Sequence, residues 1–468
     1  MPKMPQMLDS AFVNSLADIV GREQVLTDPY DLDRYSADAL NPARLYGRLD
    51  VFDRLADVVV RPGNTAQMAA VVALAARHGV PVVPYGGGTG LMGGALPVRG
   101  GMVVDLKRLD RVVEVNPTNL TVVAEAGVVL QDLENALAEH GLRHGHDPYS
   151  LAIATVGGTI STNGVGYRAG AFGPMGDQVV ALEVVLPDGR VLSTRSVPKY
   201  SSGPDLNRWF IGTEGTLGII TRATLRVARL PEAQVFATAA FAGFTQGFNA
   251  VGELLALGIR PTLLDLTEED GAVRLHLLFE GFREGVAAQE ERARQVCAQF
   301  GGLDLGPGPT LAYWRDRHQA GDNYRRTALG RPRRDRWSRQ RGRGFDYLHL
   351  ALPISQVLEY RRRCDEIMST HGVRVVEYAL WSRPELFSMM LVPAHGAGED
   401  FQASLGQAVE QVLVLAQDMG GIMEYCHGVG VRLDHLLPRE MGLGHDLLRT
   451  LKQALDPANI MNPGKLGL

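Results

Sequence analysis

The chain has 468 residues, of which 45% are hydrophobic and 21% charged, and its formal net charge is −5 at pH 7. This length is enough for two or three domains with sizeable cores, and the negative charge balance argues against a nucleic-acid partner. The three cysteines lie far apart, at positions 297, 364 and 426, which excludes a disulfide-rich scaffold and is typical of a reducing compartment.

Residues 1–21 predict an amphipathic helix rather than a secretory signal, because Asp9, Asn14 and Asp18 interrupt the apolar positions at helical spacing. No stretch approaches the roughly eighteen apolar residues of a transmembrane helix. We therefore expect a cytoplasmic protein.

Strands and helices then alternate along the chain. Residues 57–61 and 80–85 predict strands on either side of a helix over 65–78, with Thr65 as its N-cap and Gly79 at its end. Further strands, a helix and a hairpin are expected over residues 102–106, 112–128, 130–142 and 179–195.

The glycine density falls after Pro231. From residue 234 to 410 short strands alternate with helices, which predicts a second α+β domain built on one sheet. The residues after this domain are again rich in glycine and proline, and we expect them to fold back onto the first domain.

The most unusual stretch is PVVPYGGGTGLMGGALPVRGG, residues 81–101, in which Gly88 to Gly93 satisfies G-x-G-x-x-G. A Rossmann fingerprint needs a helix that begins at its glycines, but here Ala95, Leu96 and Pro97 follow. Successive residues that tolerate positive φ can instead aim their N–H groups into one concavity and bind phosphate without a helix. The alternative is a compact loop with no ligand.

Two further stretches resemble this one in composition. SLAIATVGGTISTNGVGYRAGAFG, residues 150–173, and FIGTEGTLGII, residues 210–220, combine glycine with short polar and apolar side chains. Small residues allow the backbone to approach a flat ligand closely. The three stretches together fit one long dinucleotide laid across a sheet.

The ordered motifs PYGGGTGLMGGA, ATVGGTISTNG, GTEGTLGIITRATL and DPANIMNPGKL resemble those of the vanillyl-alcohol oxidase / p-cresol methylhydroxylase (PCMH) superfamily of flavoproteins. The resemblance covers about residues 45–230 and the C-terminus. It implies an α+β fold with a two-subdomain PCMH-type FAD-binding domain over 1–230 and an α+β cap domain with an antiparallel sheet over 231–414. Residues 415–468 would return to the FAD-binding domain.

The resemblance also implies FAD in an extended form, with its pyrophosphate on residues 85–90 and its isoalloxazine between the domains. Many members attach FAD through His or Cys, but Thr89 occupies the matching place, so we expect non-covalent FAD. The implied cofactor-binding residues are Pro84, Tyr85, Gly86, Gly87, Gly88, Thr89, Gly90, Leu91, Ser150, Thr155, Gly158, Ser161, Thr162, Gly164, Glu214, Gly218, Ile219, Ile220 and Asn462.

This chain resembles two groups within the superfamily. One is the D-lactate / D-2-hydroxyglutarate / glycolate dehydrogenases, and the other is alkyldihydroxyacetonephosphate synthase. The synthase group carries three histidines where this chain has Tyr425, Cys426 and His427, and its essential tyrosine falls near Ser388. We therefore expect FAD-dependent oxidation of a small D-2-hydroxy acid or related alcohol. Ether-forming synthase chemistry and a non-catalytic flavin-binding or electron-transfer subunit stay open as alternatives.

His427 is the candidate base for this oxidation, because a glycine-flanked turn exposes its imidazole and histidine titrates near neutrality. Glu424 and Tyr425 would orient the imidazole or the substrate. The alternative is a packing histidine that binds backbone. Metal-using members carry a histidine-rich segment, and the nearest one here, around His395, lacks the second histidine, so we expect no metal.

Arginines are concentrated between residues 315 and 343. One interpretation is a solvated loop; another gives Arg325 or Arg326 to the carboxylate of an anionic substrate, since arginine binds carboxylates bidentately. Arg383 is a further candidate anchor, and His349 either lines the pocket or belongs to the core.

The remaining arginines of this segment could contact an anionic membrane surface or an acidic protein that accepts electrons. The electron acceptor itself is not determined by the sequence. We expect a homodimer.

Overall fold

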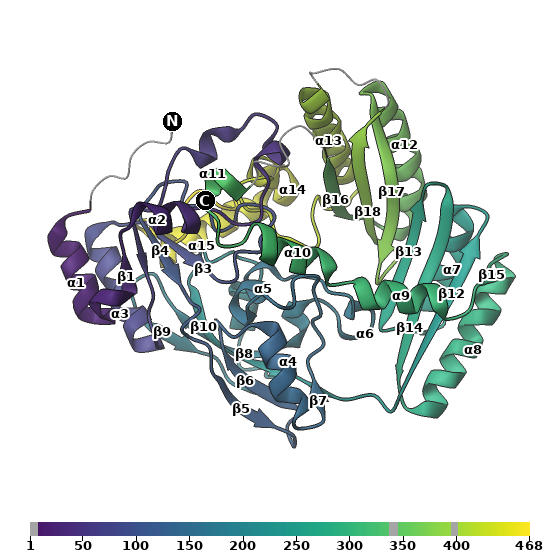
Figure 1. The fold of residues 1–468 in the computed structure, drawn as a ribbon, viewed down its shortest axis with the longest axis horizontal. Helices are drawn as coiled ribbons and strands as arrows, with labels where there is room; N and C mark the ends of the chain where they lie inside the picture. Colours follow the sequence, from purple (N-terminus) through teal and green to yellow (C-terminus); the bar gives the residue numbers. More distant parts are fainter. Residues whose placement is uncertain (1–7, 337–344, 395–400) are drawn as a thin grey trace.

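The structure, a computed structural model, describes residues 8–336, 345–394 and 401–468. Figure 1 shows two halves: the first 230 residues together with the C-terminal residues form one, and a seven-stranded sheet with its helices forms the other. Mixed helices and strands with antiparallel sheets confirm the predicted α+β class. None of the helices in the described ranges is long and apolar enough to cross a membrane.

The first subdomain is a small sheet in the strand order β1-β2-β4-β3, with parallel pairing from β2 through β4 to β3. Helices α1 and α3 pack beside each other on it. The N-cap of α3 is Asn64 rather than the predicted Thr65, because the Asn64 side chain accepts from the N–H of Gln67. The elements are α1 Ser10–Val20, β1 Val25–Leu26, α2 Pro29–Tyr35, β2 Val58–Val60, α3 Thr65–His78, β3 Val82–Tyr85 and β4 Met102–Asp105.

The second subdomain is an antiparallel sheet in the order β5-β6-β10-β8-β9. A turn over residues 117–120 joins β5 to β6, and the predicted hairpin over 179–195 is β8 and β9. The elements are β5 Val112–Asn116, β6 Thr121–Glu125, α4 Leu130–Ala138, β7 Leu142–Arg143, α5 Val156–Thr162, α6 Ala169–Phe172, β8 Val179–Val185, β9 Val191–Ser193, β10 Ile219–Arg226 and β11 Ala228–Arg229.

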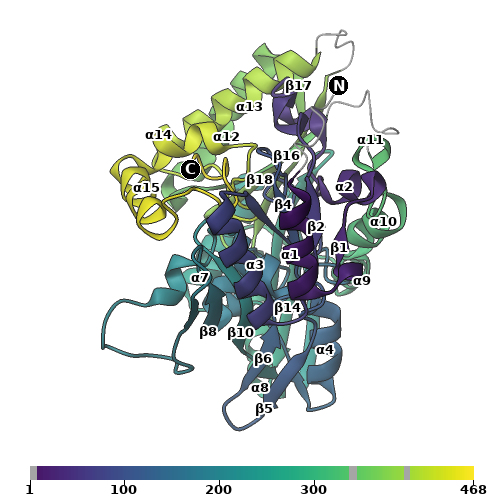
Figure 2. The ribbon, with the colours of Figure 1, turned by 90° about the vertical axis from the view of Figure 1, so that its left-hand side faces the viewer.

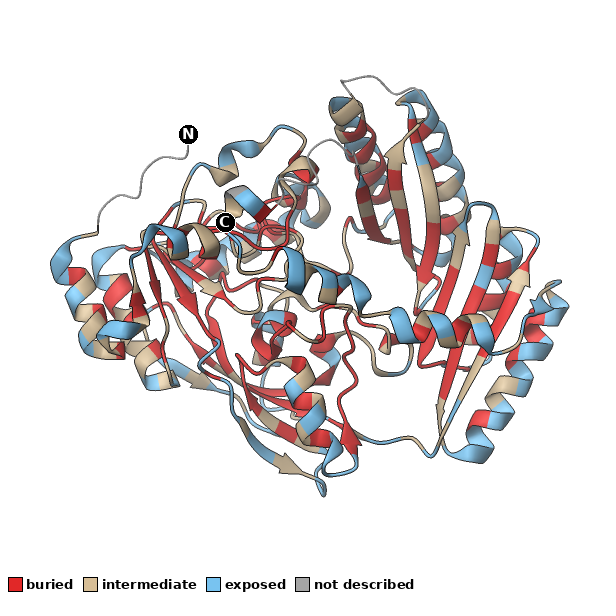
Figure 3. Cartoon of the chain, viewed as in Figure 1, coloured by how far each residue is buried: buried red, intermediate tan, exposed pale blue. Residues whose placement is uncertain are grey.

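The cap is one antiparallel sheet in the order β15-β12-β14-β13-β17-β18-β16. Its helices α7, α8, α12 and α13 contribute to a single core with alternate residues of the strands, as the buried positions in Figure 3 illustrate. The elements are β12 Ala233–Phe241, α7 Phe244–Ala256, β13 Leu263–Glu269, β14 Ala272–Gly281, α8 Arg283–Gln299, β15 Leu303–Asp304, β16 Asp346–Ala351, α12 Val357–Thr370, β17 Val373–Trp381, β18 Leu386–Pro393 and α13 Phe401–Asp418.

Two segments connect the halves. Helices α9 Gly308–Asp316, α10 Gln319–Thr327 and α11 Arg333–Arg336 run from the cap sheet to the first half (Figure 1). The C-terminal residues, including α14 Leu437–Met441 and α15 Leu443–Leu455, return to the first half (Figures 1 and 2), where Met461 forms a bridge with Val82 of β3. Both connections bring distant sequence to the glycine-rich loops.

Candidate functional site

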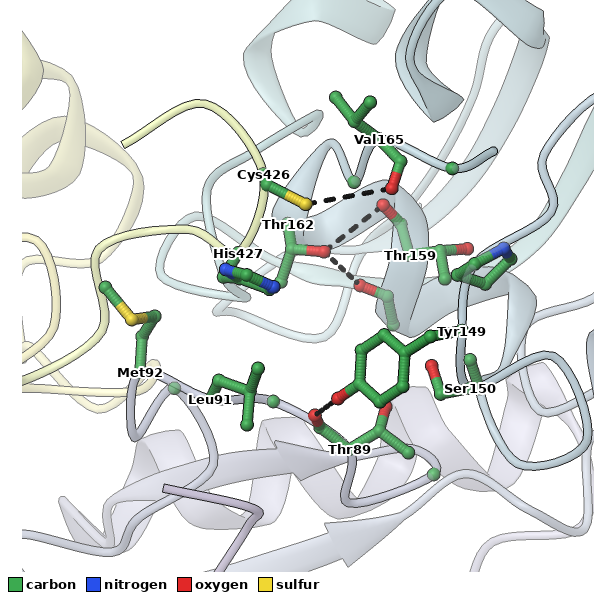
Figure 4. A pocket seen from close by; sticks show the side chains of 18 of the residues that line it. Thr89, Leu91, Met92, Tyr149, Ser150, Thr159, Thr162, Val165, Cys426 and His427 are labelled. Carbon is green, nitrogen blue, oxygen red and sulfur yellow. Dashed lines mark hydrogen bonds between the residues drawn. The ribbon is translucent and has the colours of Figure 1, made fainter. Parts of the chain in front are cut away.

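A cavity of about 810 Å³ lies between the two halves. Residues 86–92 and helix α5 line it from the first half, and β13, β14, β16 and β17 line it from the cap. Figure 4 shows Thr89, Leu91, Thr162 and His427 among the side chains that line this space. Its size and its two different walls suit an extended ligand that both halves enclose.

The glycine loop, residues 86–91, offers a row of backbone donors. Within the described residues, the N–H groups from Gly87 to Leu91 donate to no protein acceptor, although all five residues line the cavity. The loop is held by its carbonyls instead: Tyr324 donates to Gly88 O at 3.0 Å and Tyr149 donates to Thr89 O at 3.3 Å. Amides arranged in this way bind phosphate, so the loop fits the pyrophosphate of FAD.

Two glycines of the loop have no room for a side chain. A Cβ on Gly86 would lie 2.4 Å from the Thr155 hydroxyl oxygen, and a Cβ on Gly87 would lie 2.3 Å from the carbonyl oxygen of Ile153. The absence of side chains therefore lets the loop lie close against residues 153–155, just before α5, which brings the second glycine-rich stretch to the first. No helix follows the loop within residues 86–101, in agreement with the predicted exclusion of a Rossmann fingerprint.

Nearly all of the sequence-predicted cofactor residues line this cavity. Tyr85 does not, because its hydroxyl packs beneath Gly88 and donates to Ala37 O. Asn462 also lies outside the lining. The residues that do line the cavity are Pro84, Gly86, Gly87, Gly88, Thr89, Gly90, Leu91, Ser150, Thr155, Gly158, Ser161, Thr162, Gly164, Glu214, Gly218, Ile219 and Ile220.

Glu214 joins the third glycine-rich stretch to the C-terminal residues. Its carboxylate accepts from the N–H groups of Val429 at 2.6 Å and Gly430 at 3.0 Å, and burial raises its pKa to about 7. The Asn462 amide donates to the backbone carbonyls of Gly94 and Glu214. Asn462 thus positions the cavity wall rather than lining it.

His427 lies in the cavity wall next to a buried acid. Its Nδ1 is 3.5 Å from the Glu424 carboxylate, which accepts from the N–H groups of Cys426 and His427. Burial alone would lower the pKa of His427, but Cys426 and Glu424 outweigh it and raise this pKa to about 10. A pKa raised in this way favours the protonated imidazole at neutral pH, opposite to the charge state of the predicted base.

A second histidine, His349 on β16, faces His427 with 4.6 Å between the ring centroids. It is fully buried, and burial together with the charge of His427 holds its pKa well below the usual value. Its Nδ1 bonds the Ser388 hydroxyl at 2.8 Å, and Ser388 bonds the Tyr425 hydroxyl at 2.9 Å. His427 and His349 therefore favour opposite charge states, and Tyr425 lies behind His349 rather than in the cavity wall.

The three arginines predicted to hold the substrate are outside the cavity lining. Arg325 and Arg326 are exposed on α10, and the Arg383 guanidinium bonds the carboxylate of Glu385 on the surface. The structure contradicts the prediction that these arginines hold the substrate. The concentration of charge in the sequence does not indicate which face of the helix or turn each arginine occupies. The lining arginines are Arg44 and Arg274.

The arginine-rich segment is neither a solvated loop nor a substrate clamp in its described part, which ends at residue 336. The buried Arg336 donates to the carbonyls of Ala37 and Asp38, and Arg317 bonds the buried Asp147 at 2.9 Å. These contacts dock α9–α11 on the first half and place Tyr324 at the glycine loop. Residues 337–343 of the predicted segment lie outside the described residues.

Sequence reasoning missed His146, which lines the cavity and is 1% exposed. Neither ring nitrogen has a hydrogen-bond partner among the described residues, and burial lowers its pKa to about 4. The motif RHGHDPYS contains the signal, since two histidines immediately precede a glycine-rich stretch, but the sequence does not show which of them meets the cavity.

An ion cluster joins the cap to the first half beside this site. The buried Asp346 of β16 accepts from Arg44 Nε at 2.7 Å and also bonds Arg432 and Tyr46. Burial opposes its negative charge, but the two guanidiniums outweigh burial and keep its pKa below the usual value.

The described residues contain no group of three or more metal-ligating side chains. The candidate around His395 lies outside the described residues.

Two domain families match the chain. Residues 56–195 match the FAD binding domain, and residues 230–466 match the C-terminal domain of FAD linked oxidases. Together they contain the glycine loop, α5, the cap sheet and His427.

Curated relatives of three kinds match across most of their length. Glycolate oxidase subunit GlcD of Bacillus subtilis is 28% identical over 92% of this chain and 93% of its own, and D-lactate dehydrogenase of Archaeoglobus fulgidus is 30% identical over 87% and 91%. Alkyldihydroxyacetonephosphate synthase of Caenorhabditis elegans is 27% identical over 88% of this chain and 76% of its own.

Among solved structures, p-cresol methylhydroxylase with substrate bound superimposes with a TM-score of 0.78 at 19% identity, covering all of this chain and 98% of that one. This likeness confirms the PCMH-type fold.

Proposed function

We propose, from the premise that this chain belongs to the FAD-linked oxidases, that it oxidises the hydroxyl-bearing carbon of a small D-2-hydroxy acid or related alcohol. FAD is the cofactor, and the chain is an FAD-dependent oxidoreductase. When bound, FAD supplies the acceptor for a hydride. The chain must then bind the substrate anion and remove the hydroxyl proton.

The observation that carries the proposal is the pair of unlike histidines in the cavity. Protonated His427 is the cation that holds the substrate carboxylate, with Glu424 maintaining its charge. His349 is neutral before the substrate binds, and with Nδ1 bonded to Ser388 its Nε2 is left to accept the hydroxyl proton. The substrate carboxylate offsets the charge of His427, which otherwise helps to hold the pKa of His349 down. This assignment moves the base from His427, the residue expected from sequence, to His349.

The experiment is an anaerobic titration of the holoprotein with D- and L-2-hydroxy acids, followed by flavin bleaching. Wild-type protein should bleach with a D-acid. His349→Gln should bleach roughly 10²–10⁴-fold more slowly with little change in the half-saturating concentration, the usual effect of removing a general base. His427→Gln should mainly raise that concentration. Both variants should keep their FAD.

Failure of every 2-hydroxy acid to bleach the wild-type flavin would rule out the oxidation. An unchanged bleaching rate in His349→Gln, with loss in His427→Gln at saturating acid, would return the base to His427.

A second candidate is alkyldihydroxyacetonephosphate synthase chemistry, favoured by the 27% identical relative of that name. It predicts an alkyl ether from acyl-dihydroxyacetone phosphate and a fatty alcohol, with no net change in the flavin. Mass spectrometry of the extracted lipid separates this candidate from the oxidation.

We also propose a cytoplasmic location. The support is that Cys297, Cys364 and Cys426 are all buried free thiols. Cell fractionation tests it.

A further inference from the structure

The cap sheet has two chemically different faces. Along β13 and β14, Leu264, Leu266, Leu275 and Leu277 point to the helices and belong to the cap core, whereas the alternate position His276 lines the cavity. The strand register places side chains of the cavity face in rows. One row is His276, Asp265 and Trp381; another contains Ser388 and His349.

Five aromatic rings form a continuous wall, which we call the aromatic wall: His276, Tyr347 and Trp381 from this face of the sheet, Tyr313 from α9 and Tyr167 from the first half. Neighbouring centroids lie 5.0 Å apart for His276 and Tyr313, 6.2 Å for Tyr313 and Tyr167, and 6.1 Å for Tyr167 and Trp381. Tyr347 is 6.1 Å from Trp381 and 4.4 Å from His349. The wall therefore begins directly at the proposed base.

Hydrogen bonds to acidic side chains occupy the hydroxyls of two tyrosines in the wall. Tyr313 donates to the Asp265 carboxylate at 2.5 Å, and Tyr347 donates to Glu377 at 2.6 Å. These bonds fix the rings and occupy their polar ends. What the two tyrosines offer to the cavity is ring surface, not a hydrogen bond.

The same bonds join the wall to two acids, of which Glu377 lines the cavity. Burial raises the pKa of Asp265 to about 8 and also raises the pKa of Glu377, and Glu269 lines the cavity as well. Arg274 of β14 also lines the cavity, but the five rings themselves carry no charge, since burial lowers the pKa of His276 to about 4. A second substrate carboxylate placed against the rings would lose its hydration without a charged partner there, which disfavours a dicarboxylic acid.

We propose that the aromatic wall binds an aryl group on the substrate side chain, so that the preferred substrate is an aryl-substituted D-2-hydroxy acid rather than a short aliphatic or a dicarboxylic one. The hydroxy-acid part of this inference rests on the proposed function. The aryl part rests on the wall, because an aromatic ring packs favourably against rings at centroid distances of about 4.5–7 Å.

The primary test uses ligands that cannot react: propionate, glutarate and 3-phenylpropionate, each titrated into the holoprotein and followed by the visible flavin spectrum. We expect 3-phenylpropionate to bind at least about tenfold more tightly than propionate, the discrimination that apolar pocket contacts commonly give, and glutarate to bind most weakly. Equal affinity of the three, tighter glutarate binding, or no binding of 3-phenylpropionate would overturn the inference.

The turnover arm compares D-3-phenyllactate with D-lactate and D-2-hydroxyglutarate. If 3-phenylpropionate binds tightly but no hydroxy acid bleaches the flavin, the aryl site stands and the proposed oxidation fails. If the three acids bleach with equal kcat/KM and the three carboxylates bind equally, the oxidation stands and the aryl site fails.

Trp381 provides the variants. Trp381→Ala should abolish the preference for 3-phenylpropionate over propionate, and Trp381→Phe should retain most of it. Trp209→Ala is the matched control, since Trp209 is 39% exposed and outside the cavity lining. If Trp381→Ala does not fold, the Phe variant and the wild-type ligand series still decide the outcome; loss of the preference in Trp209→Ala would contradict the wall.

Discussion

The two walls of the cavity are built from different parts of the polypeptide. The glycine loop presents backbone N–H groups from Gly87 to Leu91, whereas the cap sheet presents side chains such as His349 and Trp381. We call the glycine loop the backbone wall and the cap face the side-chain wall. An added Cβ atom should disrupt the backbone wall, whereas the loss of a side chain should disrupt the side-chain wall. Cofactor binding should therefore depend on the conformation of the backbone, and substrate preference should depend on which side chains the cap carries.

The largest expected effect is on the backbone wall. Gly87→Ala places a Cβ 2.3 Å from the Ile153 carbonyl oxygen, and backbone cannot yield as a side chain tip does. We expect FAD affinity to fall at least about 100-fold, equal to about 2.7 kcal/mol, measured by flavin fluorescence titration of the apoprotein.

Gly285→Ala is the control for that variant, because a Cβ there meets nothing within 4 Å and α8 continues through it. It should keep full FAD affinity. Normal FAD binding by Gly87→Ala would mean that the loop does not need its close approach to α5.

Asp346→Ala tests what keeps the walls together. It leaves Arg44 of the first half and Arg432 of the C-terminal residues buried without their shared carboxylate. We expect the free energy of unfolding to drop by about 3–5 kcal/mol, the cost of breaking a buried ion pair, measured by urea denaturation of the holoprotein.

Removal of the exposed Asp418, which pairs with Arg439, should cost no more than about 1 kcal/mol. If Asp346→Ala and the removal of Asp418 lowered the free energy of unfolding by similar amounts, burial of the Asp346 cluster would not increase its contribution to stability.

Glu424→Gln tests the charge that we assign to His427. In the wild type the charged form of His427 is present below its raised pKa of about 10 and is lost above it. Propionate affinity should therefore be flat around neutrality and fall only as the pH passes about 10. Without the Glu424 charge the pKa of His427 drops, so propionate affinity should begin to fall at a lower pH in the variant than in the wild type.

Glu410→Gln removes an acid from the exposed His435 outside the cavity and should leave the propionate curve unchanged. A wild-type curve that already falls near pH 6.5 would indicate an ordinary histidine at position 427.

The smallest effect is expected from the arginines outside both walls. Arg383→Ala breaks only a surface pair with Glu385, and Arg325→Ala changes an exposed residue of α10. KM should stay within about twofold of the wild type, since exposed pairs contribute little. A large rise in KM would show that one of these arginines reaches the substrate after all.

The backbone wall was predictable from sequence, because glycine runs restrict what a segment can be and the order of the motifs identifies the superfamily. Most of the predicted positions that line the cavity therefore lie in the three glycine-rich stretches, within residues 86–91, 155–164 and 214–220. Tyr85 and Asn462 fall outside because a motif marks a segment, not the direction of each side chain in it.

The side-chain wall was not predictable in the same way. His349 meets Ser388 through strand pairing between residues 39 apart, a contact that the pattern within either strand does not reveal. The charge of His427 depends on a buried Glu424, and burial is a property of the fold. The arginines were misassigned for the same reason, since composition does not separate Arg336, which is buried, from Arg325, which is exposed.

The return of the C-terminal residues has a consequence for biosynthesis. Lys452 donates to the carbonyl of Thr216 across 236 residues of sequence, and Asn462 holds Gly94. At about 5–20 residues per second, a ribosome needs on the order of 10–50 s to make that interval. The first half therefore completes these contacts only after the cap residues that lie between them in the sequence have been made.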